Sequence, residues 1–138
     1  MDLRYAHLAD FASVDANGRL TIVGAFDIVW DAVGVRPIPF PPFYIAASFE
    51  ASVIEGADHE IEIQLMTEDE EPCSGLLKGT LQLRAHGVGL PAVGHALVGF
   101  GAHAVSVPEL GDHHFRFRVD GVDIGTARVS VLAPPGRP

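Results

Sequence analysis

Apolar and polar residues alternate with a period of two in several short stretches of the chain, and this alternation restricts the fold more than any other feature of the sequence. In HEIEIQL, the residues Ile61, Ile63 and Leu65 alternate with charged and amide side chains. The same pattern recurs in LLKGTLQLR and in HHFRFRV. This period is typical of a strand with one face buried and the other in water. No stretch keeps the i, i+3, i+4, i+7 spacing of an amphipathic helix, so the pattern predicts an all-β protein.

Turn-forming residues separate these stretches. DANG (residues 15–18) and DG (residues 120–121) each lie between two apolar runs, and such pairs are strong hairpin signals because both residues tolerate positive φ. Further turns are predicted at residues 55–58 and 68–72. Each proline in RPIPFPPF (residues 36–43) holds its predecessor in an extended conformation, which favours a crossover between two sheets. We therefore expect a single antiparallel β-sandwich of about eight strands, immunoglobulin-like or jelly-roll-like.

The length of 138 residues suits one domain. Residues 1–133 are predicted to form the sandwich, and residues 134–138 a short tail of proline and glycine. Hydrophobic residues make up 48% of the chain, which leaves more apolar surface than a small core needs. Surplus apolar surface favours a homo-oligomer or a component of a larger assembly.

The charge balance of the chain limits its expected partners. The chain has 18 acidic and 9 basic residues, a formal net charge of −9, and its basic residues are scattered from Arg4 to Arg137. Binding to nucleic acid depends on clustered Lys and Arg that neutralise phosphates. We therefore expect the chain to bind itself or another protein, with no nucleic acid and no membrane among its partners.

A cytoplasmic location is expected. Cys73 is the single cysteine, so no internal disulfide can form, and MDLRYAHLADF has no basic flank or apolar run of a signal peptide. Residues 87–107 are apolar enough to suggest a membrane span. Several glycines, with Pro91, His95 and His103, argue against a transmembrane helix there.

The stretch DHHFRFRVDG (residues 112–121) begins like a metal site. Successive side chains of a strand point to opposite faces, so the two neighbouring histidines cannot easily converge on one ion. The arginines of this stretch share a face with His114 and would repel a cation. Ordinary sheet histidines and no cofactor are therefore expected. The metal hypothesis that remains uses His103, Asp112 and His113, brought together across strands.

Other motifs fail on their surroundings. DANG lacks the ligand spacing of a calcium loop, and GVGLPA (residues 87–92) matches a dinucleotide fingerprint without the helix that must follow. The four carboxylates of residues 68–71 form a solvated run rather than an acid–base pair. Cys73 has no activating neighbour in the sequence, and no serine elbow is present. No catalytic residue is assigned.

The stretch from Thr21 to Trp30 is the best indication of an interface. Its large side chains Phe26, Ile28 and Trp30 share a face that is core by default, yet the opposite face is apolar as well. A strand that is apolar on both faces is either central in its sheet or covered by a partner. The interface candidates from this strand and from the proline-rich crossover are Val23, Ala25, Val29, Trp30, Phe40 and Phe43.

The run HLADFASVDANGRLTIVGAFDIVW resembles the opening of a family of short bacterial proteins of uncharacterised function. In that family an apolar strand ending in Asp-x-Ala is followed by a turn with Gly-Lys/Arg-Leu and by a strand ending in Gly-x-Phe-Asp. The matching residues here are Asp10, Ala12, Gly18, Arg19, Leu20, Gly24, Phe26 and Asp27. GDHHFRFRVDG (residues 111–121) is similar to the family's last hairpin. The resemblance implies a β-sandwich of about 130 residues in a bacterial cytoplasm, and it implies no activity.

Three hypotheses follow. The first is a non-enzymatic module that acts through protein–protein contacts, as a homo-oligomer or within a larger assembly. The second is a small-ligand-binding sandwich with an apolar pocket near residues 87–94, lined by Trp30, Phe100 and Phe117. The third is a metal-dependent enzyme that uses the three candidate ligands named above.

Overall fold

The computed structural model describes residues 1–52, 58–73, 76–85, 87 and 89–136, and within them it contains eleven strands and no helix. The strands are β1 (Asp2–Val14), β2 (Leu20–Phe26), β3 (Ile28–Trp30), β4 (Ile38–Pro39), β5 (Phe43–Ala51), β6 (Asp58–Thr67), β7 (Leu77–Gln82), β8 (Ala92–Phe100), β9 (Ser106–Val107), β10 (Gly111–Val119) and β11 (Val122–Leu132). The all-β class is thus confirmed. Most of the turn predicted at residues 55–58, part of the stretch 87–92 and the end of the tail 134–138 lie outside the described residues.

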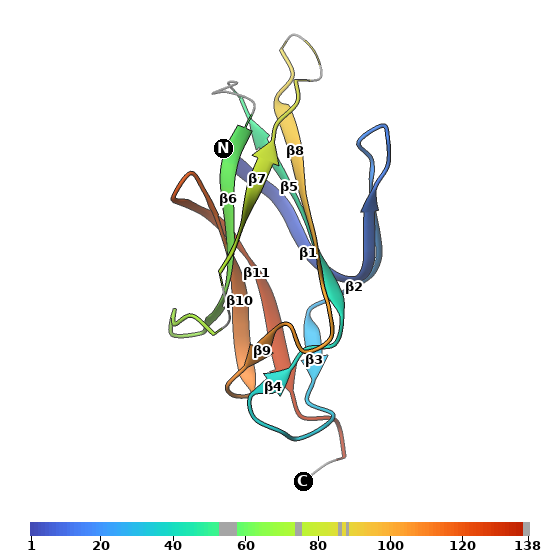
Figure 1. Ribbon diagram of the computed structural model, residues 1–138, viewed down its shortest axis with the longest axis vertical. Coiled ribbons are helices and arrows are strands. Elements are labelled where there is room, and N and C mark those ends of the chain that lie inside the picture. The colour runs from blue at the N-terminus through green and yellow to red at the C-terminus, as the bar shows by residue number, and fades with distance from the viewer. Residues whose placement is uncertain (53–57, 74–75, 86, 88, 137–138) are drawn as a thin grey trace.

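Two larger sheets face each other across one apolar core (Figure 1). The first sheet has the order β2-β1-β5-β8, the second β3-β11-β10-β6-β7, and β4 pairs with β9 in a small third sheet. The prediction of about eight strands in one antiparallel sandwich is corrected in two respects. The described strands form three sheets, and β3 runs parallel to β11.

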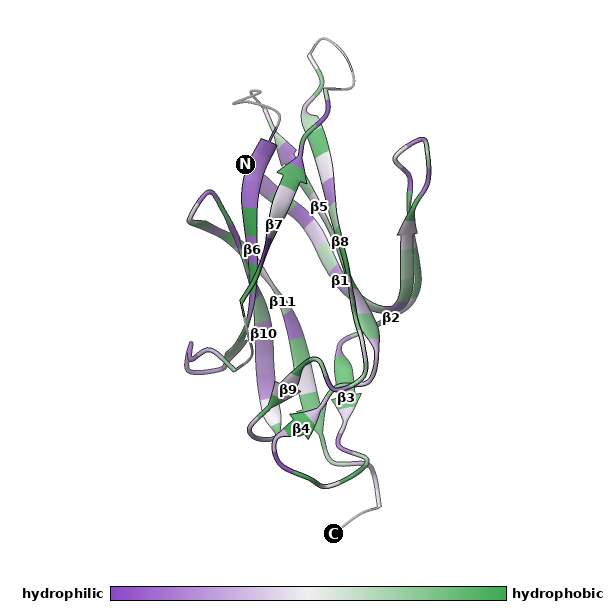
Figure 2. Ribbon diagram, in the orientation of Figure 1, coloured by the Kyte–Doolittle hydropathy of each residue, from purple (hydrophilic) through white to green (hydrophobic). Residues whose placement is uncertain are grey.

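Both sheets contribute large side chains to the core. Phe49 of β5 and Phe117 of β10 are fully buried, with ring centroids 6.2 Å apart. Figure 2 shows hydrophobic and hydrophilic residues alternating along the strands, as a sheet with one buried face requires. The period-two stretches of the sequence therefore form β6, β7 and β10, as predicted.

The predicted hairpin turns are confirmed. Asp120 and Gly121, between β10 and β11, both have positive φ, 51° and 79°. Gly18, between β1 and β2, has φ of 76°, and the Asp15 carboxylate accepts hydrogen bonds from the backbone N–H groups of Asn17 and Arg19. Only turns with positive φ match the twist of a tight hairpin, which explains the glycines at both sites.

The stretch from Thr21 to Trp30 is not one strand. β2 belongs to the first sheet and β3 to the second, so the chain crosses between the sheets at Asp27. The crossing reverses the expected faces, since Val29 is 3% exposed whereas Trp30 is 47% exposed. The proline-rich stretch then leads back from β3 to β5 in the first sheet, which confirms the predicted crossover.

The β1–β2 hairpin bends where Asp10 faces Gly24. The residues before the bend pair with β5, and those after it pair with β2 alone. Gly24 has φ of 67°, and a Cβ built on it would overlap the Asp10 carboxylate. Beyond the bend, residues 10–24 form an arm that extends beside β8, where Nε2 of His95 donates a hydrogen bond to the Gly18 carbonyl at 3.1 Å (Figure 1).

Candidate functional site

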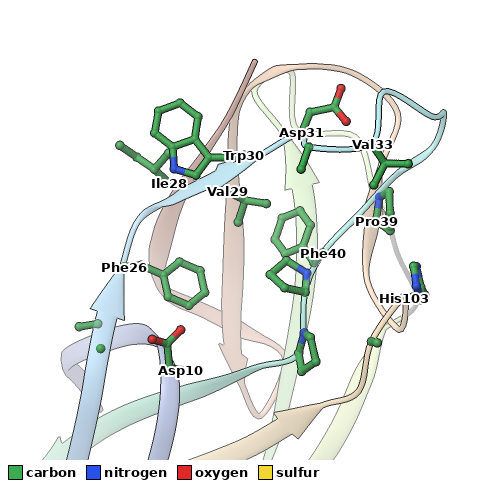
Figure 3. Close-up of a pocket in the computed structure, with 16 residues that line it drawn as sticks. Asp10, Phe26, Ile28, Val29, Trp30, Asp31, Val33, Pro39, Phe40 and His103 are labelled. Carbon is green, nitrogen blue, oxygen red and sulfur yellow. The ribbon is translucent and has the colours of Figure 1, made fainter. Parts of the chain in front are cut away.

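A pocket of about 670 Å³ lies where the chain leaves the first sheet and joins the second. We call it the end pocket. Its walls come from residues 24–26 and 28–33, from the proline-rich residues 39–42 and from residues 102–103, with Asp10 of the β1–β2 arm at one side. Figure 3 shows Phe26, Val29 and Phe40 around its centre. This volume falls in the range of pockets that bind small molecules or single anchoring side chains.

The walls of the end pocket are mostly apolar, and several of their side chains pack against the hydrophobic core. Val29 and Phe40 are buried members of the core, so the floor of the pocket is the end of the core itself. Phe26 packs against the same core, with its ring 6.3 Å from that of Phe43. An apolar group that enters here replaces water on a rigid apolar floor, and burial of one Leu-sized or Phe-sized side chain is worth about 1.5–3 kcal/mol.

Large apolar side chains stand exposed around the pocket. Ile28 is 40% exposed, Trp30 47% and Val33 69%, and all three line it. Val35, on the same loop as Val33, is 47% exposed. Contiguous exposed apolar side chains around a concave site are typical of an interaction surface rather than of a scattered solvent face.

The carboxylate at this site is held within the protein. Asp31 is 8% exposed and accepts hydrogen bonds from the Gly34 backbone N–H and from Nη1 of Arg36, each at 3.0 Å. The ion pair closes residues 31–36 into a short loop that carries Val33. Asp31 therefore shapes the rim, and its hydrogen-bonding capacity is used within the loop.

The structure divides the six predicted interface residues into two groups. Val23 is 52% exposed, Ala25 is exposed, and Trp30 is 47% exposed. Val29, Phe40 and Phe43 are 1–3% exposed and belong to the core, so no partner can reach most of their surface. The end pocket nevertheless brings four of the candidates together, namely Ala25, Val29, Trp30 and Phe40.

Sequence reasoning missed the loop residues Asp31 and Val33 and the prolines that wall the pocket. The signal for Asp31 was weak but present, because Asp31, Gly34 and Arg36 have the spacing of a capped loop. No local pattern indicates that Val33 is exposed in the wall of the pocket that Trp30 also lines.

The three metal candidates do not form one site. His103 lines the end pocket, whereas Asp112 and His113 lie on β10. Asp112 accepts hydrogen bonds from the Ser130 hydroxyl at 2.7 Å and from Nη2 of Arg128 at 2.8 Å, and these contacts, the Ser130 hydroxyl first, lower its pKa. His113 is 4% exposed. Among the residues that the structure describes, no group of three or more His, Cys, Asp or Glu side chains is arranged to hold a metal ion.

Cys73 lies in an environment that disfavours a nucleophile. Burial, followed by the charge of Glu71, raises the pKa of its thiol. A reactive cysteine needs the opposite shift, because the thiolate is the attacking species. Separately, no helix in the described ranges is long and apolar enough to cross a bilayer.

The three aromatic residues expected to line a small-ligand pocket lie in different surroundings. Phe117 is fully buried in the core, and Phe100 stacks on Phe43 with ring centroids 4.8 Å apart. Trp30 lines the end pocket instead. These three aromatic residues therefore do not enclose a common ligand.

Comparisons with known proteins identify a family for this chain and no activity. A family model described as a family of unknown function (DUF6941) matches residues 4–132. Comparison with curated proteins gives no match. Among solved structures, the Pseudomonas fluorescens alkylpurine DNA glycosylase AlkC bound to DNA containing an abasic site analog matches with a TM-score of 0.39 and 10% sequence identity. The match covers 93% of this chain and 30% of the glycosylase chain, so this chain spans less than a third of that protein.

This comparison contradicts the expected set of partners, which left nucleic acid out. The matched glycosylase is bound to DNA, and the exclusion is withdrawn. The exclusion rested on the net charge of −9, a property of the whole chain that does not describe the field at one local surface. At this TM-score and identity, the likeness assigns no binding activity to the chain.

Proposed function

The chain belongs to DUF6941, a family of unknown function whose model spans residues 4–132, and from the end pocket we propose that it is a non-enzymatic β-sandwich module that acts through protein–protein contacts, with a second copy of itself as the partner. The observation that carries the proposal is the exposed Trp30 beside an apolar pocket of about 670 Å³. The residues that dominate the binding energy of protein interfaces are enriched in tryptophan and cluster in desolvated pockets.

A second copy fits this surface because each copy has both an apolar protrusion and an apolar pocket. The exposed valines of the 31–36 loop protrude, and the pocket beside them is hollow and apolar. In a two-fold dimer each copy supplies both parts, so the loop of one copy can enter the pocket of the other twice over. The contact buries Ile28, Trp30 and Val33 without requiring any buried charge to lose its partner.

The type of sandwich and the cellular location are part of the same proposal. The facing sheets support a sandwich of the immunoglobulin-like or jelly-roll-like kind. The single cysteine, which can form no internal disulfide, supports a cytoplasmic location. The resemblance of the sequence to a family of short bacterial proteins supports a bacterial origin.

Native mass spectrometry tests the proposal directly. We expect the purified protein to give a multiple of 14.7 kDa, and we expect Trp30→Glu and Val33→Glu to give monomers, because each places an unpaired charge in the contact. The matched control is Val122→Glu, a 62% exposed valine in the β10–β11 hairpin that does not line the end pocket.

Two outcomes would overturn it. A wild-type protein that remains monomeric at high micromolar concentration has no such contact. Dissociation by Val122→Glu as readily as by Val33→Glu would show that charge alone, and not the pocket, governs the assembly. Circular dichroism of each variant separates dissociation from unfolding.

A further inference from the structure

The edges of the two large sheets meet only in part. β7 and β8 are joined by the bridge between Arg84 and Val93, with two backbone hydrogen bonds of 3.0 Å. Next to the bridge Gly94 lies so close to β7 that a Cβ would overlap the Gln82 carbonyl oxygen. Farther along, the strands separate and leave a cavity of about 440 Å³ that reaches the core residues Ile61 and Ile63.

Gly79 produces this opening. The core-facing positions of β7 alternate, and Gly79 stands between Leu77 and Leu81 where a large apolar side chain is expected. Its φ is not positive, so the backbone does not require glycine. A Cβ at Gly79 would make only an ordinary contact, 3.8 Å from Cγ2 of Ile61. The absence of a side chain at Gly79 therefore leaves the cavity between β7 and β8 open.

A second cavity continues the first towards the surface. It has a volume of about 530 Å³ and lies between the β1–β2 arm and the outward-facing side chains of β7 and β8. Val14, Thr80 and His95 line both cavities, so the two form one path whose outer part is more polar than its inner part. The hydrogen bond from His95 to the Gly18 carbonyl ties the arm over it.

Arg84 lines the outer cavity, and among the described residues no carboxylate lies within salt-bridge distance of its guanidinium group. Every other Lys or Arg of the described part has a carboxylate within salt-bridge distance; these are Arg4, Arg19, Arg36, Lys78, Arg116, Arg118 and Arg128. Asp15 also lines the outer cavity, but its carboxylate accepts hydrogen bonds within its own turn and pairs with Arg19. In a chain of net charge −9, an unpaired guanidinium beside an apolar opening is a specific attraction for an anionic group.

We propose that this path binds a single-chain aliphatic carboxylate, with the carboxylate at Arg84 and the hydrocarbon tail passing Gly79 to reach Ile61 and Ile63. The site is separate from the end pocket, and the inference does not depend on the proposed self-association. Each methylene that leaves water for the inner cavity raises the affinity about fourfold. The ion pair at the exposed mouth adds at most about fivefold, because solvent screens it.

Isothermal titration calorimetry with three probes of equal chain length tests the assignment. The probes are decanoate, decanol and decyltrimethylammonium, each below its micelle concentration. We expect decanoate to bind at one equivalent, decanol about two- to fivefold more weakly, and the cation more weakly still. Octanoate should bind about 16-fold more weakly than decanoate, since it lacks two methylenes.

Variants locate the site. Gly79→Leu should fill the opening and abolish binding of all three probes, and Ala96→Leu should do the same from β8. Arg84→Gln should bring decanoate down to the affinity of decanol and leave decanol unchanged. Arg128→Gln, an exposed arginine paired with Asp112 on another strand, is the matched control and should change nothing.

The proposal is overturned if no probe binds, if decanoate and decanol bind equally to the wild type, or if both leucine variants, shown to be folded by circular dichroism, still bind decanoate as the wild type does. Binding of decanoylated phospholipid vesicles with no binding of free decanoate would also overturn it, because the ligand would then be a membrane lipid.

Discussion

The carboxylate of Asp120 in the β10–β11 turn lies 2.6 Å from Nδ1 of His59 on β6. His59 is buried, and the same carboxylate accepts a hydrogen bond from the Glu60 backbone N–H at 3.0 Å. The hydrogen bond from His59, followed by that from Glu60, lowers the pKa of Asp120. This contact joins the β10–β11 turn to the first residues of β6, the strand that pairs with β10.

This contact predicts a pH dependence of stability. A carboxyl whose pKa is lowered by folding stabilises the fold above its unfolded pKa of about 3.9 and loses that contribution as the pH falls through the folded value. Asp120→Asn should therefore lower the urea midpoint at pH 7, and the difference from wild type should vanish at the acid end. Asp2→Asn, which removes an exposed carboxylate, is the control. A difference between wild type and Asp120→Asn that persists unchanged below pH 3 would contradict this origin.

The bend of the β1–β2 arm predicts unequal costs for two glycine substitutions. A Cβ at Gly18 has no atom within 4 Å. Gly18→Ala should therefore lower the free energy of unfolding only through the strain of positive φ, by about 1–2 kcal/mol. Gly24→Ala has the same backbone strain, and its Cβ also overlaps the Asp10 carboxylate. It should lower the free energy of unfolding by about 2–4 kcal/mol in total. Adding Asp10→Ala to Gly24→Ala should restore the part of the stability that the overlap removes, and the part lost to positive φ should remain lost. Chemical denaturation of Gly18→Ala, Gly24→Ala, Asp10→Ala and the double variant Asp10→Ala/Gly24→Ala measures these costs, and equal costs at Gly18 and Gly24 would show that the overlap is relieved without loss.

The packing of the two sheets predicts a large effect at Phe117. Its ring is fully buried against Phe49, so Phe117→Ala should lower the free energy of unfolding by about 3–5 kcal/mol. Val122→Ala, at a 62% exposed position, should change it by less than about 0.5 kcal/mol. Urea titration followed by circular dichroism gives both values. A loss below about 1 kcal/mol at Phe117 would mean that the core closes over the space.

The loop at the end pocket predicts a coupled effect. Asp31→Ala removes both hydrogen bonds that close residues 31–36 and should cost about 1.5–3 kcal/mol, the range for hydrogen bonds to charged groups. Because the loop carries Val33, the dimer should also weaken. Arg36→Gln removes the ion pair but keeps the Gly34 hydrogen bond, so it should have the smaller effect on both readouts, unfolding free energy and native mass. Equal effects would place the stabilisation in the ion pair alone.

Local sequence patterns predict much of the fold but do not predict the candidate sites. The alternation in β6, β7 and β10 and the turns at Gly18 and Gly121 depend on residues close in sequence, and these were predicted from it. The split between β2 and β3 was not, because a chain that leaves one sheet for another stays extended and keeps an apolar alternation. A crossing changes which alternate residues face the core, as a shift of one residue does in a strand.

The candidate sites depend on contacts between distant residues. Trp30 was predicted both as core by default and as an interface candidate, and only the crossing at Asp27 shows that it is exposed. The opening beside Gly79 requires β7 and β8 to separate, and the isolation of Arg84 requires knowledge of where every carboxylate lies. Neither is a property of a sequence window.

The parallel pairing of β3 with β11 has a consequence for synthesis on the ribosome. Ile28, Val29 and Trp30 pair with residues 130–132, about one hundred positions later in the chain. At translation rates of about 5–20 residues per second, the early segment waits roughly 5–20 s for its partner. Throughout that interval the side chain of Val29 has no strand to cover it, so the nascent protein passes through a stage in which chaperones have an apolar target that the finished protein conceals.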